Sequence, residues 1–371
     1  MRLLIWGTTV LAVVAIFAVW ANRQVLNPNN WANTSTKFLQ NAKIREATSN
    51  YLVDQLYANV NVADELKTRL PPQLQPLAAP VAGALQNLAV TASERALANA
   101  RVQEVWKHAN RASIETFIAI VEGKGAVSTN GGQVTLDLAP VVTNITNRLG
   151  LPNVSSKIPP SIAHIKILSS KGLKAIQDGV KALKGLDLLL TIIVPLLYAL
   201  AIFLARERRR QALMRVGVAI VFAGLLVFVG REIVESATVN SLVKVEANKP
   251  AAEAIVSIAT GMLSEIAGAF VIVGIPLIAA AWFAGPARLA VKARRAIAPF
   301  LRDQPAWTYG IVAAIMLLIF IWGPIPATRK PAGIIVFLAL AFFGTEVLRR
   351  QTASEFADAA RPPQEIPAAG A

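Results

Sequence analysis

Six apolar runs divide this chain, and they constrain its fold more than any other feature. The hydrocarbon core of a bilayer is about 30 Å thick, and a helix needs about 20 residues to cross it. Hydrophobic residues make up 54% of the chain and charged residues only 16%, against about 25% charged in an average soluble domain. We therefore predict a predominantly α membrane protein with six transmembrane helices, at residues 3–21, 186–204, 216–229, 266–285, 306–322 and 332–348.

Basic residues concentrate in the short segments between these runs. Residues 205–215, residues 286–305 and the tail from Arg349 all lie on one side if the chain crosses six times. Short loops rich in Lys and Arg stay in the cytoplasm. The pattern predicts a multi-pass plasma-membrane protein with both termini cytoplasmic. The residues that set this topology are predicted to be Arg206, Arg208, Arg209, Arg210, Arg294 and Arg295. An arginine site for anionic lipid or phosphate at residues 206–210 is the alternative interpretation.

The first run, residues 1–21, has two interpretations. Its apolar stretch is longer than the usual signal-peptide core of about 7–15 residues, and bulky Trp20 lies where a cleavage site needs small residues. We therefore favour an uncleaved transmembrane signal anchor over a cleaved signal peptide.

Residues 22–185 are amphipathic and are predicted to form one extracytoplasmic helical domain. Asn27 precedes Pro28 and is suited to cap a helix, and the four prolines of residues 70–80 should end another. On the helix after residue 100, Val105, Trp106 and Phe117 share a face that predicts core packing. Residues 128–138 alternate around Asn-Gly, which predicts a small β-hairpin, and residues 162–168 could extend it to a three-stranded sheet.

The remaining segments complete the predicted layout. Helical spacing continues without interruption from Leu173 into the second run, which predicts one helix that leaves the outer domain and enters the bilayer. Residues 186–348 form a five-helix membrane bundle. Its second outside segment, residues 230–264, should extend spans three and four and pack against the outer domain. Residues 349–371 form a short cytoplasmic tail, predicted to be disordered.

The formal net charge is +15 and the chain has no cysteine. Excess positive charge can indicate nucleic-acid binding, but here the arginines flank apolar runs, so membrane orientation explains them and no nucleic-acid partner is predicted. The lipid bilayer is the first expected partner. The outer domain carries a basic surplus, which makes anionic envelope polymers or lipid headgroups candidate ligands. A protein partner in the membrane is a further candidate. The lack of cysteine excludes disulfides, thiol catalysis and Cys-ligated metals.

Polar residues provide no recognisable catalytic motif, cofactor site or metal site. His108 lies four residues after Glu104 on a helix, which predicts a solvated ion pair, and His164 stands apart in a predicted strand. Nothing in the sequence brings two carboxylates together as an acid and base pair. The carboxylates weighed for such a pair are Glu94, Glu104, Glu115 and Glu122.

Within the apolar runs, a few residues are expected to shape the bundle. Pro195 and Pro276 lie in mid-span and should kink their helices. Gly268 and Gly274 permit close contact between helices. Arg231 and Glu265 are predicted to form a structural ion pair at the outer interface.

Several stretches together resemble a family of uncharacterised multi-pass membrane proteins from high-GC Gram-positive bacteria. They include IREATSNYLVDQLYANVNV, LPPQLQPLAAPVAGAL, RVQEVWKHAN, GQVTLDLAP, AAWFAGPAR and LRRQTASEF, spread from Ile44 to Phe356. The resemblance implies a plasma-membrane protein with an extracytoplasmic helical domain. It implies no activity and no functional residues, because none are established for the family.

Two functional hypotheses follow. The first is a membrane-anchored extracytoplasmic binding, sensing or scaffold module without enzymatic activity, which the large outer domain and the lack of catalytic motifs favour. The alternative is a small-molecule or lipid transporter that uses the helix bundle, with a cavity near Pro195 and Pro276. The ligand, the oligomeric state and the direction of any signal do not follow from the residues.

Overall fold

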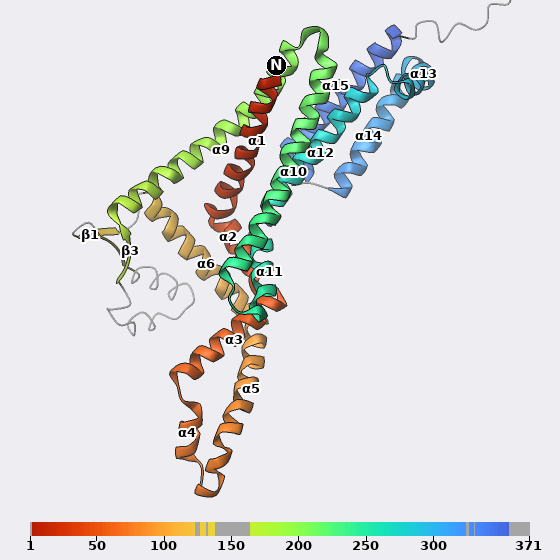
Figure 1. Ribbon diagram of the computed structural model, residues 1–371. Helices are drawn as coiled ribbons and strands as arrows, with labels where there is room; N and C mark the ends of the chain where they lie inside the picture. Colours follow the sequence, from red (N-terminus) through yellow and green to blue (C-terminus); the bar gives the residue numbers. More distant parts are fainter. Residues whose placement is uncertain are drawn as a thin grey trace, which may run out of the picture. The chain divides into compact units, whose positions relative to one another are not determined.

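A computed structural model describes residues 2–122, 127–130, 133–137, 164–323, 326–329 and 331–355. Of the tail predicted at residues 349–371, residues 349–355 are helical, which corrects the prediction of disorder there, and the rest lies outside the described residues. Gly131 of the predicted Asn130-Gly131 turn also lies outside them. The described chain is predominantly helical and divides into two compact units by its internal contacts (Figure 1). Unit 1 comprises Met1–Ile16, Leu190–Phe228 and Ser264–Ala371, and unit 2 comprises Phe17–Leu189 and Val229–Leu263.

Five helices in the described part of the chain are long and apolar enough to cross a membrane. They cover Arg2–Val25, Gly172–Leu204, Arg209–Ser241, Gly261–Phe283 and Pro305–Trp322. Each overlaps one of the first five apolar runs, which is the pattern of a membrane-embedded protein. The sixth run, residues 332–348, lies within α15 (Pro331–Glu355). It is helical throughout, and its crossing of the bilayer stays a prediction.

The core of unit 1 is formed by small and aliphatic side chains of three helices. These are α1 (Arg2–Trp20), α9 (Ser170–Leu204) and α10 (Arg209–Leu242). Tyr198 of α9 is buried and its hydroxyl lies 3.3 Å from the Thr9 hydroxyl of α1. Alanine dominates the contact, which lets the helix backbones approach closely. The buried residues of this cluster are Ile5, Ala12, Ala15, Leu190, Val194, Tyr198, Ala201, Val216, Ala219 and Ala223.

A second face of α10 packs against α12 (Gly261–Phe283) through glycines. A Cβ atom on Gly224 would lie 2.6 Å from the carbonyl oxygen of Ala267, and one on Gly274 would lie 2.9 Å from the carbonyl oxygen of Gly217. Both distances are below any van der Waals contact, so only glycine fits. Gly274 therefore has the predicted packing role, whereas a Cβ on Gly268 would meet only Phe228, at 3.9 Å.

Tryptophans lie near the ends of the apolar helices, where the boundary between hydrocarbon and water is expected. Trp307 and Trp322 stand close to the two ends of α14 (Pro305–Trp322) and are both exposed. At 1.5 Å per residue their backbones are separated by about 22 Å along the helix. Aromatic side chains at this spacing match the two interfacial belts of membrane proteins.

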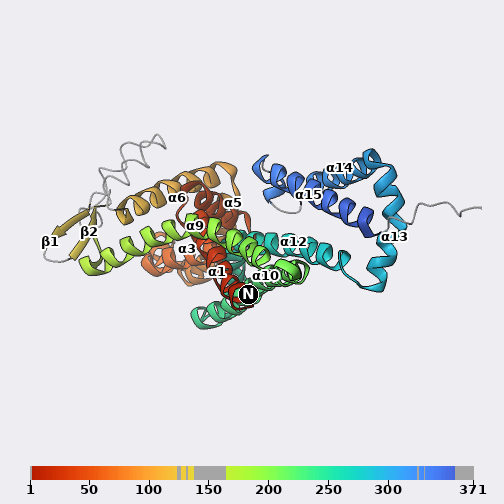
Figure 2. The same cartoon turned by 90° about the horizontal axis from the view of Figure 1, so that it is seen from above.

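The segment predicted as a basic connection, residues 286–305, is largely a helix, α13 (Arg288–Asp303). Figure 1 looks along α13 while α12, α14 and α15 run lengthwise, and Figure 2 shows α13 from the side. Within unit 1, α13 therefore lies across the ends of these helices, and it contacts α14 and α15. The expectation of a plain loop was wrong because α13 is amphipathic but too rich in charge to read as a span.

Unit 2 is built around α2 (Pro28–Gln40), which contacts α3 (Ala42–Asn59), α6 (Ala100–Val121) and α11 (Lys249–Ala259). The predicted cap is confirmed, because the Asn27 side chain accepts hydrogen bonds from the backbone of Asn29 and Asn30. α11, which lies in the segment of residues 230–264, packs on α2 and α3, as the sequence predicts for this segment. The indole of Trp106 on α6 donates to the Ser35 carbonyl, at 2.9 Å.

The prolines end a helix where the sequence predicts it. The helix α4 (Val62–Arg69) stops before them, a 3₁₀ turn follows at Pro72–Leu77, and α5 (Ala78–Ala98) then returns alongside α3 and α4. These elements form an arm of unit 2 (Figure 1). We call α3, α4, the 3₁₀ turn and α5 the arm.

Three short strands pair in antiparallel fashion in the order β1-β2-β3. They are β1 (Val127–Asn130), β2 (Gln133–Asp137) and β3 (His164–Ser169), with Val127 opposite Leu136 and Asp137 opposite His164. From β3 the chain enters α9, which is one continuous helix through Leu204, as the spacing of its apolar residues predicts. Within unit 2, Gln177 of α9 donates to the Ile120 carbonyl of α6 at 3.0 Å.

The glycine contact gives a pair of variants with opposite expected effects. Gly224→Ala should lower the thermal stability of the detergent-purified protein, because its methyl group would overlap the Ala267 carbonyl. In the control, Gly230→Ala, the added Cβ has no atom within 4 Å. It should leave the stability unchanged or raise it, by up to about 1 kcal/mol of helix propensity. Equal unfolding temperatures for both variants would contradict close packing of α10 on α12.

Candidate functional site

The arm of unit 2 exposes large apolar side chains on both of its long helices. Leu88 of α5 is 65% exposed and Tyr51 of α3 is 63% exposed. Soluble surfaces rarely carry contiguous apolar patches of this kind unless the patch binds something. The exposed apolar residues of the arm are Tyr51, Leu52, Leu56, Val60, Leu74, Leu77, Val81, Leu85 and Leu88.

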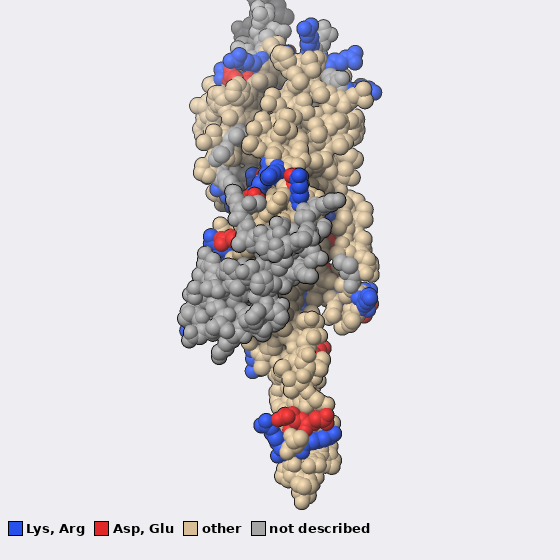
Figure 3. All heavy atoms as spheres, turned by 90° about the vertical axis from the view of Figure 1, so that its left-hand side faces the viewer, with Lys and Arg blue, Asp and Glu red and all other residues tan. Residues whose placement is uncertain are grey.

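Charge is absent from the end of the arm. The sequence has no Asp, Glu, Lys or Arg from Leu70 to Ser93. Glu94 follows this stretch on α5, and Asp54 of α3 accepts a hydrogen bond from Gln86 within it at 3.0 Å. On α4, before the stretch, Arg69 pairs with Glu65 at 2.7 Å and Lys67 with Asp64 at 3.4 Å. In Figure 3 these pairs form a band of red and blue with an uncharged tip beyond it. The arm therefore offers apolar contact without a strong electrostatic preference.

The spacing of the exposed apolar residues along α5 favours a helix as the binding partner. Val81, Leu85, Leu88 and Ala92 follow one another at intervals of four, three and four residues and are all exposed. Residues at this spacing form one stripe along a helix, and such stripes pack against the ridges of another helix. We call these four residues the α5 stripe. Full burial of one leucine contributes about 1.5–3 kcal/mol, so a helix laid along the stripe would gain several such contributions.

The predicted core face of α6 is wrong in part. Val105, Trp106 and Phe117 are 42%, 39% and 45% exposed, whereas Ala112, Ile120 and Val121 are buried. Trp106 nevertheless contacts α2 through its indole, which donates to the Ser35 carbonyl. Periodicity alone does not indicate which apolar residues of the helix are buried.

Three of the four candidate carboxylates, Glu104, Glu115 and Glu122, lie beside a basic side chain. His108 Nε2 lies 3.9 Å from Glu104 Oε1 and both side chains are exposed, which confirms the solvated pair. Arg111 binds Glu115 at 2.8 Å and Lys184 binds Glu122. His164 lies in β3. Among the described residues no group of three His, Asp or Glu side chains is arranged to hold a metal ion.

Arg231 binds Glu235 and not the predicted Glu265. Its Nη2 lies 3.2 Å from Glu235 Oε2, one turn along the same helix. The guanidinium also donates to the hydroxyls of Thr260, at 2.7 Å, and Ser257, at 3.1 Å. A partner four residues away is within reach without any change of backbone, and Glu265 is exposed. Arg231 thus links α10 to α11 inside unit 2.

Arg294, which the sequence predicts to set the topology, is buried in the structure, and its effect on topology stays a prediction. Its side chain is 2% exposed. Nε and Nη2 donate to the two carboxylate oxygens of Glu355 at 3.0 and 2.8 Å, and Nη1 donates to the carbonyls of Phe283 and Gly285. A bidentate carboxylate and two carbonyls compensate the buried charge. The guanidinium ties α13 to the end of α15 and to the end of α12.

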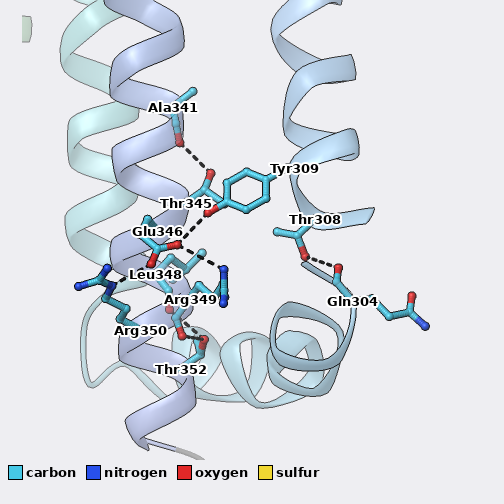
Figure 4. A network of polar contacts seen from close by, with 10 residues as sticks. All are labelled: Gln304, Thr308, Tyr309, Ala341, Thr345, Glu346, Leu348, Arg349, Arg350 and Thr352. Carbon is cyan, nitrogen blue, oxygen red and sulfur yellow. Dashed lines mark hydrogen bonds and ion pairs between the residues drawn. The ribbon is translucent and has the colours of Figure 1, made fainter. Parts of the chain in front are cut away.

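Glu346 forms a second polar cluster at this end of unit 1. Figure 4 shows the Tyr309 hydroxyl of α14 directed at Glu346 of α15, to which it donates at 2.8 Å. Arg350 donates to the other carboxylate oxygen at 2.8 Å. The Tyr309 ring also stacks on Phe342, with centroids 5.5 Å apart. The carboxylate near the end of the predicted sixth span is thus satisfied, and the cluster joins α14 to α15.

The remaining predicted residues are located as follows. Pro195 lies inside α9 and Pro276 inside α12. Arg206, Arg208, Arg209 and Arg210 lie at the turn between α9 and α10, all exposed, as is Arg295 on α13. Arg206 has a φ of 35°, in the left-handed region, which this tight turn imposes. The guanidinium of Arg210 lies over Gly285, so the first basic turn touches the second.

Comparison with known proteins gives no family for this chain. It matches no protein-family model, no curated protein and no solved structure.

Two arginine variants separate burial from charge at neighbouring positions. Arg294→Lys keeps the charge but cannot fork between Glu355 and two carbonyls, so the unfolding free energy should fall by about 3 kcal/mol, as for other broken buried pairs. Arg295→Lys changes an exposed side chain and should stay within about 0.5 kcal/mol of the wild type. Thermal unfolding in detergent measures both. If Arg294→Lys proves as stable as Arg295→Lys, the contacts of Arg294 with Glu355 and the two carbonyls do not hold α13 in place.

Proposed function

We propose that this chain is an integral plasma-membrane protein whose unit 2 lies outside the cytoplasm and binds an apolar helix of a partner protein. The unit 1 helices act as its anchor. The observation that carries the proposal is the α5 stripe, which leaves Leu85 and Leu88 exposed on an arm without charge at its end. The protein is proposed to be a binding or scaffold module and not an enzyme.

Orientation in this proposal follows from the basic residues. The α9–α10 turn, α13 and the end of α15 carry exposed arginines, and the positive-inside tendency assigns them to the cytoplasm. An odd number of crossings separates each of these segments from unit 2. Both termini are therefore proposed to be cytoplasmic, and residues 22–185 to be outside.

The side chains of the arm support an apolar helix, rather than an anionic ligand, as the partner. Anionic envelope polymers and lipid headgroups need basic side chains, and the stretch from Leu70 to Ser93 has none. An apolar helix complements the stripe in both shape and polarity. The basic surplus elsewhere in unit 2 is explained by solubility.

Continuity of α9 supports a sensing role for the same module. Lys184 and Gln177 of α9 contact Glu122 and Ile120 near the end of α6. The helix continues without a break through Leu204. A partner that displaces α6 within unit 2 would therefore act directly on a helix that also contributes to the unit 1 core.

The transporter alternative receives less support. It requires a path for substrate beside the mid-span prolines. Gly274, two residues before Pro276, packs directly against Gly217 and Val221 of α10. Close packing between α10 and α12 favours an anchor over a passage between these two helices.

A photocrosslinking amino acid placed at Leu88 in living cells tests the proposal. The expected result is a discrete adduct with one protein, whose crosslinked peptide is an apolar helix. A second copy of this chain counts as such a protein. The adduct should disappear when Leu85→Glu is added, because a charge in the contact loses apolar burial.

Asn87 provides the matched control, because it is exposed on the same helix but outside the stripe. Asn87→Glu should leave the Leu88 adduct intact. Adducts with lipid alone, no adduct, or equal loss with Asn87→Glu would overturn protein binding at the arm.

A further inference from the structure

The helix α13 has three distinct faces. Ala290, Arg294 and Ala298 are buried against the rest of unit 1. Arg288, Lys292 and Arg295 are exposed and follow at intervals of four and three residues, so they form one basic stripe. We call these three residues the α13 basic stripe. At about 100° of rotation per residue, the stripe and the buried face point in clearly different directions.

A third face of α13 is apolar and also exposed. Leu289 is 71% exposed. Ala293 and Ala296 are also exposed and lie on the same face of the helix. This face lies about 100° around the helix from the basic stripe. An exposed leucine beside a basic stripe does not stabilise a helix that faces only water. At a membrane surface the same leucine is buried among acyl chains, which strengthens binding of the helix to lipid.

The position of α13 suits such a surface. It lies across the ends of α12, α14 and α15 in unit 1 (Figures 1 and 2). Arg294 fixes it there through Glu355 and the last carbonyls of α12. Trp307, which begins the neighbouring α14, is exposed at the same end and is suited to the interfacial region.

In the part of the chain that the structure describes, the basic stripe lies outside the ion pairs of unit 1. Among the described residues, Arg288, Lys292 and Arg295 have no ion-pair partner, whereas the adjacent Arg294 takes both oxygens of Glu355. Three cations without an ion-pair partner among the described residues, beside an apolar face, complement a surface that offers both negative charge and apolar contact. That surface is a leaflet with phosphate-bearing, negatively charged headgroups above acyl chains.

We propose that α13 is an interfacial helix that binds anionic phospholipid, with the α13 basic stripe on the headgroup phosphates and Leu289 in the acyl region. The helix is then a second anchor of unit 1, in addition to the spans. Each basic residue held near an anionic leaflet strengthens lipid binding by about fivefold. Removal of the stripe should therefore weaken the preference for anionic lipid by about a hundredfold if the three act independently. The proposal does not depend on what the arm of unit 2 binds.

Lipid binding by the purified full-length chain tests it. The chain in uncharged detergent is titrated with phosphatidylglycerol or with phosphatidylcholine of the same acyl chains, and retained lipids are counted by native mass spectrometry. The wild type should prefer phosphatidylglycerol, and salt should reduce that preference. The combined variant Arg288→Gln, Lys292→Gln, Arg295→Gln should lose it.

The matched control removes the same charge from exposed positions in unit 2. Arg95→Gln, Arg101→Gln and Lys107→Gln together should keep the preference for phosphatidylglycerol. If the α13 variant binds this lipid as the wild type does, or if both triple variants lose it equally, the assignment to α13 is overturned.

A second measurement leaves the basic stripe intact and does not depend on the stability of the triple variant. The chain has no cysteine, so Leu289→Cys can carry a single polarity-sensitive dye in phosphatidylglycerol vesicles. Its emission should be blue-shifted and quenched by lipids brominated near the headgroup, and a dye at Lys107→Cys should not be. Quenching of the Leu289→Cys dye by aqueous iodide, without quenching by the brominated lipid, would overturn interfacial burial.

Discussion

A guanidinium group that enters hydrocarbon loses its water, and the rest of this structure depends on that cost. An arginine at the centre of an inserted helix is less favourable by about 2.5–3.5 kcal/mol. Four exposed arginines in the turn between α9 and α10 therefore resist translocation together. From this constraint we propose that the turn, α13 and the end of α15 lie on one side of the membrane and that unit 2 lies on the other. The binding role proposed for the arm and the lipid role proposed for α13 both take their side of the membrane from it.

Burial in unit 1 is achieved with two kinds of contact. Small residues bring α10 close to its neighbours, with alanines toward α1 and α9 and glycines toward α12. Between spans there is no hydrophobic gain over lipid, so close backbone approach supplies the attraction. At the basic end the contacts are polar, and Arg294 and Glu346 are each compensated by partners from other helices or turns. The Arg294 contacts tie α13 to the ends of α12 and α15, and the Glu346 cluster joins α14 to α15.

Much of this architecture could be predicted from local sequence, and the failures have a common cause. Apolar length identifies the spanning helices, Asn27 with Pro28 identifies a helix start, and the prolines after Leu70 identify the return of the arm. The predicted partner of Arg231 was wrong, and the partner of Arg294 was not predicted, because both depend on tertiary structure. Glu235 lies one helical turn from Arg231 and binds it in place of Glu265. Glu355, which binds Arg294, lies 61 residues away in the sequence. Periodicity likewise marked Trp106 and Phe117 as apolar without indicating that neither is buried. The α5 stripe could have been noticed as a stretch of 24 residues without charge, from Leu70 to Ser93.

Single-cysteine labelling of intact cells tests the central orientation most directly, because the cysteine-free chain has no background. Asn87→Cys on the arm and Gln211→Cys beside the arginine turn are both exposed positions. A membrane-impermeant maleimide should label the Asn87→Cys variant in intact cells, and the Gln211→Cys variant only after the cells are opened. Labelling of Gln211→Cys in intact cells, with Asn87→Cys protected, would invert the topology and contradict the account.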